Sequence, residues 1–307
     1  MKKKRSKINY FAQYVGFSAF VSIIRLLPLN ISMLFGKSIV YVFYLIDRKH
    51  RKIAYENLRN AYGEELSDFQ KRKIIRRCYQ HFASVAIDFV KFPRKINRSN
   101  WKKHFEVEGL EFAKNALKEG KGIIFVSGHI GNWEVLGCAM DFIFYPMHSI
   151  AKHMKNPFID RSYKKLREYA GQKVIFTRNA SRAMLKALKN NEMLGVLVDQ
   201  NSRKNSIFVD FFGQKAATTR GVATLSLKTG APIIMLFSRR IDGRYRFKIS
   251  FSKPIQIEKT GDLEMDILSL TQRYTTMIES RIREHPHEWL WMHRRWKTRP
   301  PTIDYSP

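Results

Sequence analysis

Short apolar runs that alternate with amphipathic stretches restrict the fold of this chain more than any other feature. The runs lie at residues 122–127, 174–177, 193–198 and 232–237. The stretches between them, at residues 132–143, 157–170, 181–190 and 219–229, have the length and pattern of helices. Buried strands joined through helices are typical of a parallel sheet, because each parallel connection must cross the sheet. The sequence therefore predicts an α/β fold with a mostly parallel central sheet flanked by helices.

Helical signals also precede this region. Residues 50–62 have the pattern of a helix that ends at Gly63. Ser67 and Gln70 have the spacing of a capping box, which predicts a second helix from there to about residue 90. Pro93 is expected to end that helix, because proline has no N–H to donate.

The end of the chain completes the predicted domain. Residues 245–251 alternate between apolar and polar side chains, which predicts an antiparallel strand near an edge of the sheet. A helix at about residues 263–284 closes the fold. With no repeat and no Gly/Ser-rich linker, residues 48–307 are expected to form a single α/β domain.

The N-terminal region is apolar and basic at both ends. Residues 8–27 and 29–46 are apolar segments separated by Pro28. The basic flanks are Lys2, Lys3, Lys4, Arg5 and Lys7 before them and Arg48, Lys49, Arg51 and Lys52 after them. Basic residues favour the cytoplasmic side, so two basic flanks indicate a re-entrant or interfacial hairpin, or a shallow anchor, rather than a clean span. We expect residues 1–47 to attach the chain to the membrane; a buried core helix of a soluble protein is the alternative.

The net charge requires anionic partners. Lysine and arginine number 56 and acidic residues 26, giving a formal charge of +30, which suits nucleic acid, anionic lipid or an acidic protein. No helix-turn-helix, zinc-finger or RNA-recognition signature supports a nucleic-acid-binding protein, and that hypothesis leaves the apolar N-terminus without a role. The two cysteines, Cys78 and Cys138, form no CxxC pair, so we expect a reducing compartment and no metal site.

The segment Ile123 to Glu134, IIFVSGHIGNWE, contains the candidate reaction centre. A buried strand leads directly into His129, and ligands of α/β sheets bind just beyond such strand ends. On one continuous helix His129 and Glu134 would lie about 140° apart, so they can meet only across a turn, which Gly128 and Gly131 would allow. We expect His129 to act as a general base and Glu134 to orient its imidazole.

The His129–Glu134 spacing is weak support when taken alone. The chain has nine histidines, and chance supplies about one match to this spacing. A structural histidine that caps a loop is the alternative, and the strand–Gly–His context favours catalysis over it. The chain has no G-x-S-x-G, Walker A or Rossmann glycine pattern, so it gives no support for a nucleophile-elbow hydrolase or a nucleotide-binding enzyme.

The segment SGHIGNWE at residues 127–134 resembles the H-x4-D/E block of the lysophospholipid acyltransferase superfamily. Its H-x-G-N-W-E portion is similar to that of the bacterial lipid A biosynthesis acyltransferases, which add lauroyl or myristoyl chains. Further motifs occur in the order expected for that family: the Asn57-Leu58 helix, VDQ at 198–200, FFGQKAATTRG at 211–221, TGAP at 229–232 and WLWMHRRWKTRP at 289–300. The E-G-T block of glycerol-phosphate acyltransferases is absent, which weakens a role in phospholipid synthesis.

The resemblance implies an acyltransferase with His129 as base and Glu134 as its acidic partner. It implies acyl carrier protein as the donor, with acyl-CoA as an alternative, no metal or other cofactor, and a hydroxyl of a phosphorylated lipid A precursor as the acceptor. Another glycolipid or a phospholipid is the alternative acceptor. Such enzymes act at the inner membrane with the site facing the cytoplasm, where an acidic carrier protein and anionic lipid would attract a basic chain.

Four further residues are candidates for substrate binding: Asn132, Arg167, Asp199 and Arg220. Asp199 ends an apolar run, so it shares a sheet edge with His129 if the sheet is parallel, and it is a candidate partner for Arg167. A strand-end turn or helix cap is the alternative for Asp199, and a solvated helix face is the alternative for Arg167. The aromatic and basic tail at residues 289–299 suits either the bilayer interface or the protein core.

Overall fold

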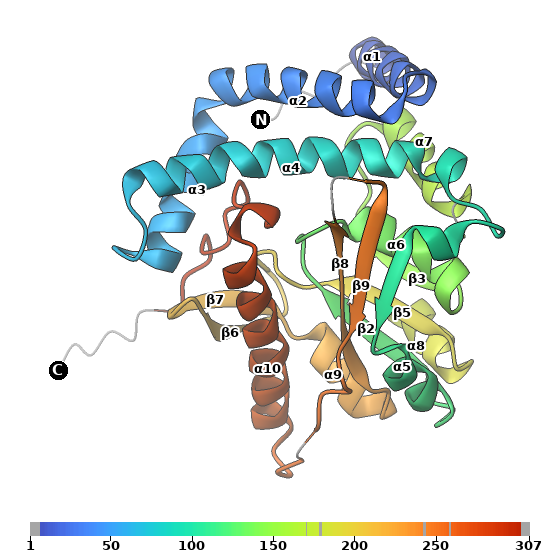
Figure 1. The fold of residues 1–307 in the computed structure, drawn as a ribbon. Coiled ribbons are helices and arrows are strands. Elements are labelled where there is room, and N and C mark those ends of the chain that lie inside the picture. Colours follow the sequence, from blue (N-terminus) through green and yellow to red (C-terminus); the bar gives the residue numbers. More distant parts are fainter. Residues whose placement is uncertain (1–6, 170, 178–179, 242–243, 258, 302–307) are drawn as a thin grey trace.

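The computed structural model describes residues 7–169, 171–177, 180–241, 244–257 and 259–301, which form an α/β fold around a seven-stranded sheet (Figure 1). The strand order is β1-β9-β8-β2-β5-β3-β4. These strands are β1 (Phe105–Glu108), β2 (Ile123–Ser127), β3 (Met147–Ala151), β4 (Lys173–Phe176), β5 (Met193–Leu197), β8 (Ile233–Ile241) and β9 (Arg246–Phe251). A separate hairpin consists of β6 (Ser206–Phe211) and β7 (Gln214–Thr219).

The sheet is mostly parallel, as predicted. β2 pairs in parallel with both β5 and β8, and β3 pairs in parallel with β4 and β5. β9 is the predicted antiparallel strand, and it pairs with β8. It lies one strand in from the edge, because β1, which the sequence did not predict, pairs in parallel along its outer side.

Helices cover both faces of the sheet. They are α3 (Arg48–Tyr62), α4 (Asp68–Lys95), α5 (Leu110–Leu117), α6 (Trp133–Ile143), α7 (Pro157–Tyr169), α8 (Ala180–Lys189), α9 (Gly221–Thr229) and α10 (Leu263–Glu284). Alternate residues of β2 enter two separate cores: Ile123 and Phe125 pack with α4, α5 and α6, whereas Ile124 and Val126 pack with α8, α9 and α10. Because both faces are buried, β2 is apolar at every position but its last.

The predicted ends of α3 and α4 are confirmed with one exception. Gly63 ends α3 at a φ of 47°, and Ser67 and Gln70 form the capping box that begins α4. Pro93, however, lies inside α4, which continues to Lys95. The prediction failed because a proline in the last turn removes only one intrahelical hydrogen bond, and the Ile96 N–H still donates to the Phe92 carbonyl across 3.0 Å.

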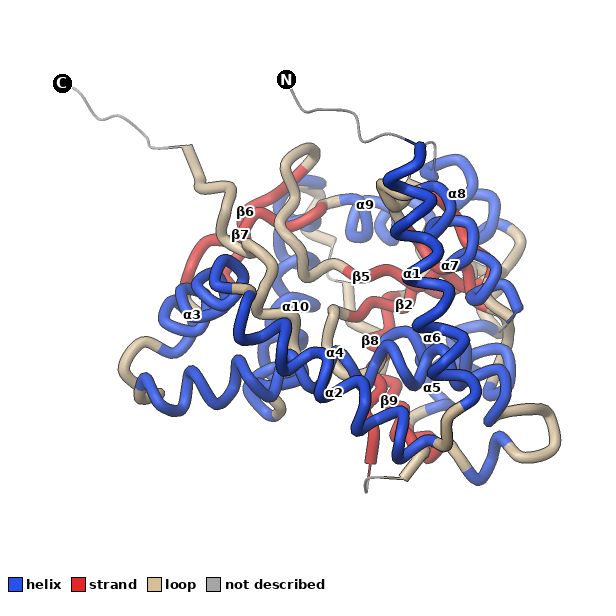
Figure 2. The backbone as a smooth tube through the Cα atoms, turned by 90° about the horizontal axis from the view of Figure 1, so that it is seen from above, coloured by secondary structure: helices blue, strands red, loops and turns tan. Residues whose placement is uncertain are grey.

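The two apolar N-terminal segments form α1 (Lys7–Leu26) and α2 (Leu29–Ile46), which lie outside α4 (Figure 2). α2 runs along α4, and α1 contacts both α4 and α7. Within the described residues, α2 is the one helix long and apolar enough to cross a membrane, and only 11% of that segment is buried. The basic residues 2–5 lie outside the described residues.

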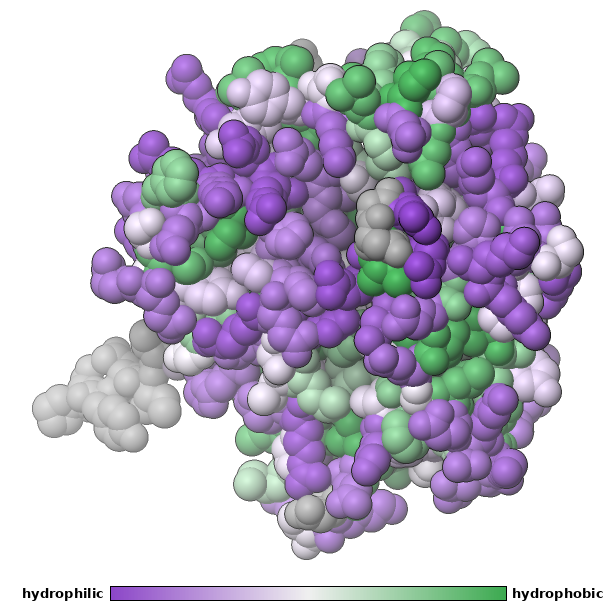
Figure 3. Space-filling view, viewed as in Figure 1, coloured by the Kyte–Doolittle hydropathy of each residue, from purple (hydrophilic) through white to green (hydrophobic). Residues whose placement is uncertain are grey.

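Both N-terminal helices expose apolar side chains to solvent. Leu34 and Ile46 of α2 are 70% and 71% exposed, and Ile8 and Leu26 of α1 are 82% and 79% exposed. Figure 3 shows several hydrophobic residues at the top of the molecule, over α1 and α2. A helix pair of a soluble core would bury these residues, and exposed apolar faces of this kind are typical of sites that contact a partner or a membrane.

Candidate active site

The register of the sheet brings His129 and Asp199 together. β2 and β5 are parallel neighbours, and Ser127 at the end of β2 pairs with Leu197 at the end of β5. His129 and Asp199 each follow their strand by two residues, so both leave the same edge of the sheet at the same level. The Val198 N–H donates to the Ser127 carbonyl across 3.1 Å and keeps the two segments aligned beyond the strands. The shared sheet edge expected for these two residues is therefore present.

The Asp199 carboxylate binds the imidazole of His129. His129 Nδ1 lies 2.8 Å from Asp199 Oδ1, while the His129 backbone N–H and the Trp289 indole N–H each donate to Asp199 Oδ2 across 2.8 Å. Because an ionised carboxylate only accepts hydrogen bonds, the ring proton resides on Nδ1. Nε2 is then the nitrogen with a free lone pair, and this is the nitrogen that a general base requires.

The charges of the pair favour an ionised Asp199 and a more basic His129. Burial would raise the pKa of Asp199, but the charge of His129 and the three hydrogen bonds lower it to about 2. Burial would lower the pKa of His129, but the Asp199 carboxylate and, to a smaller extent, Glu134 raise it above its ordinary value. The imidazole is therefore a stronger proton acceptor than a free histidine.

Glu134 binds Arg167, which corrects the predicted contact between Glu134 and His129. Arg167 Nε donates to Glu134 Oε2 across 3.1 Å, and Nη2 donates to Oε1 across 2.7 Å. A planar guanidinium satisfies both carboxylate oxygens at once, which an imidazole cannot do. Asp199 already accepts the Nδ1 proton, so the two acids have exchanged the partners that the sequence suggested for them.

Aromatic side chains hold the Glu134–Arg167 pair beside the imidazole. The Trp133 indole N–H donates to Glu134 Oε1 across 3.0 Å, and the Trp133 ring meets the His129 ring edge-on with centroids 5.3 Å apart. The Arg167 guanidinium lies over the Tyr163 ring, 4.8 Å from its centroid. Burial would lower the pKa of Arg167, but the Glu134 carboxylate raises it, so the guanidinium stays charged.

A cavity of about 1060 Å³ adjoins the reaction centre, and His129, Glu134 and Arg167 line it. Apolar residues form much of its wall: Ile124, Ile150, Val174, Met184, Val196 and Leu225. The lining also includes basic side chains that are exposed to solvent: Lys152, Arg203 and Lys204. The cavity therefore combines an apolar interior with cationic groups at its surface, an arrangement that suits an amphipathic anionic ligand.

The two other predicted substrate-binding residues have protein partners. Asn132 caps α6: its side chain accepts from the Val135 N–H across 3.1 Å and donates to Asp88 across 3.0 Å. Arg220 pairs with Glu264 of α10. Neither side chain lines the cavity, because Asn132 caps α6 and Arg220 binds Glu264 of α10.

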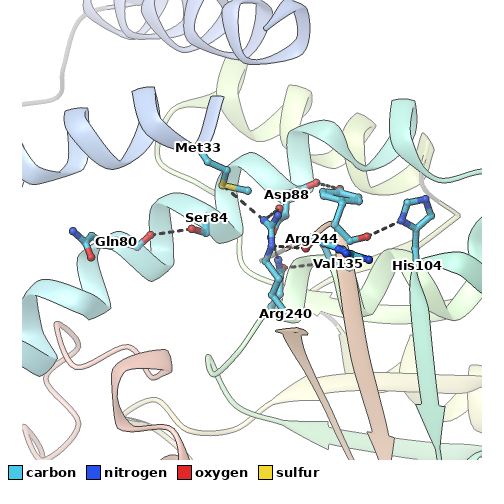
Figure 4. A network of polar contacts seen from close by, with 10 residues as sticks. Met33, Gln80, Ser84, Asp88, His104, Val135, Arg240 and Arg244 are labelled. Carbon is cyan, nitrogen blue, oxygen red and sulfur yellow. Dashed lines mark hydrogen bonds and ion pairs between the residues drawn. The ribbon is translucent and has the colours of Figure 1, made fainter. Parts of the chain in front are cut away.

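An ion pair between the buried Asp88 and the partly buried Arg240, shown in Figure 4, supports the start of α6. Asp88 of α4 accepts from Arg240 of β8 across 2.6 Å through Oδ1 and from Asn132 through Oδ2. Met33 of α2 lies beside the same guanidinium, with its sulfur 3.7 Å from Arg240 Nη1. The cap that places Trp133 and Glu134 is therefore connected through α4 and β8 to the apolar N-terminal helix.

The C-terminal segment after α10 holds the His129 loop in place. The Leu290 N–H donates to the His129 carbonyl across 3.2 Å, and the Gly131 N–H donates to the Glu288 carbonyl across 3.2 Å. Asn57 of α3 in turn donates to the carbonyls of Trp291 and His293. Trp289 and Trp291 are 1% and 0% exposed, so core packing is the correct interpretation of these two residues of the tail.

Gly131 is expected to be intolerant of a side chain. Its φ is 61°, and a Cβ there would collide with the Ser238 carbonyl oxygen. Gly120 is a matched control, because its φ of 73° is also positive but nothing lies within 4 Å of a Cβ. We expect Gly120→Ala to lower the free energy of unfolding by about 1 kcal/mol and Gly131→Ala by about 3 kcal/mol or more. Chemical denaturation measures both values. If the two variants lost the same free energy of unfolding, the backbone at residue 131 would have moved to relieve the collision.

Sequence reasoning missed three polar contributors to the site. Trp289 belongs to the aromatic tail, and its indole donates to Asp199. Gln200 is the last residue of the VDQ motif, and its Nε2 lies 3.5 Å from His129 Nε2. His293 lines the cavity, and its Nε2 accepts from the Asn201 N–H across 2.8 Å. The position of Gln200 directly after Asp199 was the available signal, since a residue at a strand end faces the same ligand site.

Comparison with known proteins gives a consistent result along the chain. A family model described as bacterial lipid A biosynthesis acyltransferase matches residues 1–298. The lipid A biosynthesis lauroyltransferase of Escherichia coli (strain K12) is 27% identical over 264 residues, covering 82% of this chain and 81% of the relative. The lipid A biosynthesis palmitoleoyltransferase of the same strain is 26% identical over 257 residues, covering 82% of this chain and 80% of the relative.

A more distant relative is named for a different acceptor. The phosphatidylinositol mannoside acyltransferase of Mycolicibacterium smegmatis (strain ATCC 700084 / mc(2)155) is 20% identical over 256 residues, covering 78% of this chain and 81% of the relative. The similarity therefore extends to acyltransferases named for two kinds of glycolipid.

Proposed function

Because the chain belongs to the bacterial lipid A biosynthesis acyltransferase family and is thus an enzyme that transfers acyl groups, we propose that it moves a fatty acyl chain from an acyl carrier protein thioester to a hydroxyl of a lipid A precursor. One observation carries the assignment of the reaction centre: an Asp199-bound imidazole opens onto a cavity with an apolar wall. An acyl chain fits such a wall, and the imidazole is the base that a hydroxyl acceptor needs.

The proposed reaction uses His129 first as base and then as acid. His129 Nε2 takes the proton of the acceptor hydroxyl while its oxygen bonds to the thioester carbonyl carbon, and the carbonyl electron pair moves to oxygen. As the tetrahedral intermediate collapses, the carbon–sulfur bond breaks and the departing thiolate receives the proton from Nε2. Asp199 keeps the ring oriented and stabilises its protonated form throughout. No covalent acyl-enzyme is required.

Two donors beside the imidazole are suited to the negative charge on the carbonyl oxygen. The Gln200 amide contacts His129 Nε2 at 3.5 Å, a long contact that an incoming substrate can replace. Arg167 lines the same cavity and keeps N–H groups beyond the two that bind Glu134. Glu134 then contributes by fixing the guanidinium, which supports a role for this acid that does not require contact with His129.

Charge and exposed apolar surface support the proposed partners and location. Acyl carrier proteins are acidic and the acceptor carries phosphates, so both suit the cationic residues Lys152, Arg203 and Lys204 that line the cavity. The apolar faces of α1 and α2, together with the +30 charge, suit attachment to an anionic membrane. We place the enzyme at the inner membrane with its site towards the cytoplasm, where acyl carrier protein is found.

The proposal is tested by an acyl-transfer assay on the membrane-extracted protein. Acyl carrier protein loaded with defined acyl chains is incubated with a lipid A precursor, and the product is followed by mass spectrometry. A mass gain of one acyl chain is the expected result. Acyl-CoA in a parallel reaction tests the donor, and phosphatidylinositol mannoside tests the other acceptor class. Transfer to the mannoside alone would replace the lipid A precursor as the acceptor.

Glu134 and Arg167 are expected to act as one unit. Glu134→Gln keeps the shape of the side chain but loses its charge, and we expect a rate about a hundredfold lower because the guanidinium is no longer fixed. Arg167→Met should cost as much, and the double variant should cost no more than either single variant. Initial rates of acyl transfer give this comparison. Losses that multiply in the double variant would show that the two residues act separately.

A further inference from the structure

A second cavity lies on the opposite side of α7 from the reaction centre. It is a groove of about 470 Å³ between α1, α4 and α7. These three helices come together at the upper right of Figure 1, and Figure 2 shows α1 lying over α7. Ser162, Lys165 and Leu166 of α7 line the groove, whereas Tyr163 and Arg167 line the catalytic cavity. One helix therefore separates two sites, and the groove takes no part in the proposed chemistry.

The groove contains cations without acidic partners. Arg25, Arg94 and Lys165 line it, and no acidic side chain does so within the described residues. None of the three has an ion-pair partner in the described part of the chain. Arg94 Nη1 donates to the Arg25 carbonyl across 2.9 Å, so the end of α1 supplies partial negative charge, about half an elementary charge for a whole helix. The positive charge of the three side chains exceeds this partial negative charge, so the groove keeps a net positive charge that favours an anion.

The remaining walls are apolar or carry hydroxyl groups. Phe17, Val21 and Val90 supply apolar surface from α1 and α4, and Ser18 and Ser22 supply hydroxyl groups from α1. Arginine, lysine and serine are the donors that proteins use for phosphate oxygens, whereas the apolar walls suit hydrocarbon. The groove therefore matches a phosphate group attached to alkyl chains better than it matches a free phosphate ion.

The surroundings of the groove indicate where such a molecule would come from. Exposed apolar residues of α1, including Phe11, Val15 and Ile23, continue the hydrophobic surface of the helix whose other side chains line the groove. A helix with this surface lies at the level of lipid headgroups, with its apolar side chains towards the acyl chains. A headgroup beside α1 can then reach the three cations without leaving the bilayer.

We propose that the groove between α1, α4 and α7 is a binding site for the phosphate headgroup of an anionic membrane phospholipid. The proposal rests on the membrane attachment given above and is independent of the acyl-transfer chemistry. A bound lipid fixes α1 against α7. Asn156, the residue just before α7, already ties the two helices together, because its side chain donates to the Tyr10 carbonyl across 2.8 Å. The lipid would thereby set the orientation of the catalytic cavity relative to the membrane.

The test measures lipid binding to the full chain without any acyl donor. The dissociation constant is obtained by native mass spectrometry with phosphatidylglycerol and phosphatidylcholine, and inorganic phosphate and lipid A precursor are used as competitors. We expect phosphatidylglycerol to bind more tightly than phosphatidylcholine, and Lys165→Gln and Arg94→Gln each to weaken it about fivefold or more. Lys95→Gln is the matched control, because Lys95 is exposed on the same end of α4 but does not line the groove.

Each other outcome overturns the proposal in a recognisable way. Equal weakening by Lys95→Gln would mean that the basic surface attracts anionic lipid without a site. Lys165 forms no ion pair with an acidic residue within the described part of the chain, so Lys165→Gln breaks none there. No weakening in that variant would place the lipid elsewhere. Displacement by lipid A precursor alone would assign the groove to the acceptor, and displacement by inorganic phosphate would assign it to a free anion. Absence of acyl transfer by the unaltered chain, measured separately and with phosphatidylglycerol binding intact, would contradict the proposed function and leave the lipid site standing.

Discussion

His129→Ala is expected to lower the rate of acyl transfer about a thousandfold, because it removes the group that takes the proton from the acceptor hydroxyl. The substitution leaves Asp199 with two of its three donors, the His129 backbone N–H and the Trp289 indole, so the fold should persist. The measurement is the initial rate with acyl carrier protein donor and lipid A precursor, taken together with a thermal melt.

His50→Ala is the matched control for this experiment. His50 is an exposed histidine at the start of α3 whose ring binds Asp47, outside the cavity lining, so the same change there should leave the rate within about twofold. His129→Gln adds a second comparison, because glutamine can still bond to Asp199 but cannot act as a base. A well-folded His129→Ala protein with a near-normal rate would rule out the proposed mechanism.

Asp199→Asn is expected to reduce the rate about a hundredfold or more and to move its dependence on pH. The carboxylate is the principal group that raises the pKa of His129 against the effect of burial. General-base catalysis needs the neutral imidazole, so the wild-type rate should increase with pH through a pKa above the ordinary histidine value. Without the carboxylate that pKa falls, and the rising limb of the profile should move to lower pH while its plateau falls.

The pH profile separates the roles of the two acids. Glu134→Gln removes a smaller contribution to the pKa of His129, so its profile should move less than that of Asp199→Asn even where the plateaus are equally low. If instead the pH profile of Glu134→Gln moved to lower pH and that of Asp199→Asn stayed close to wild type, Glu134 would be the partner of the imidazole. Melting temperatures of both variants identify any loss that is due to unfolding alone.

Of the seven strands of the sheet, the sequence predicted β2, β4, β5, β8 and β9 and missed β1 and β3. β2 is apolar at four consecutive positions because both its faces are covered. β3 is only half-buried after its first residue, and its Ile150 and Ala151 line the cavity, so its apolar run is too short to stand out. β1 reads FEVE and lies at the edge of the sheet, where one face is exposed. Pairing, rather than composition, makes these segments strands.

The position of His129 at a sheet edge was predicted, whereas its acidic partner was not. A strand that ends in Gly-His and another that ends in Asp imply a shared edge, and the parallel register confirms it. The register of two strands is fixed by the whole sheet, so the choice of Asp199 over Glu134 as partner of the imidazole was not available from the motif. The direction of α7, which brings Arg167 to Glu134, depends likewise on tertiary packing.

The dependence of the site on the C-terminal segment has a consequence for biosynthesis. Chains leave the ribosome from the N-terminus, so α1 and α2 emerge long before β8, which completes the middle of the sheet, and before Trp289, which donates to Asp199. A nascent chain carries His129 and Glu134 for most of its synthesis without the segment that holds the His129 loop. A message truncated after α10 would therefore yield a protein that keeps the SGHIGNWE motif of residues 127–134. It would lack the Trp289 contact to Asp199 and the Leu290 contact to the His129 loop.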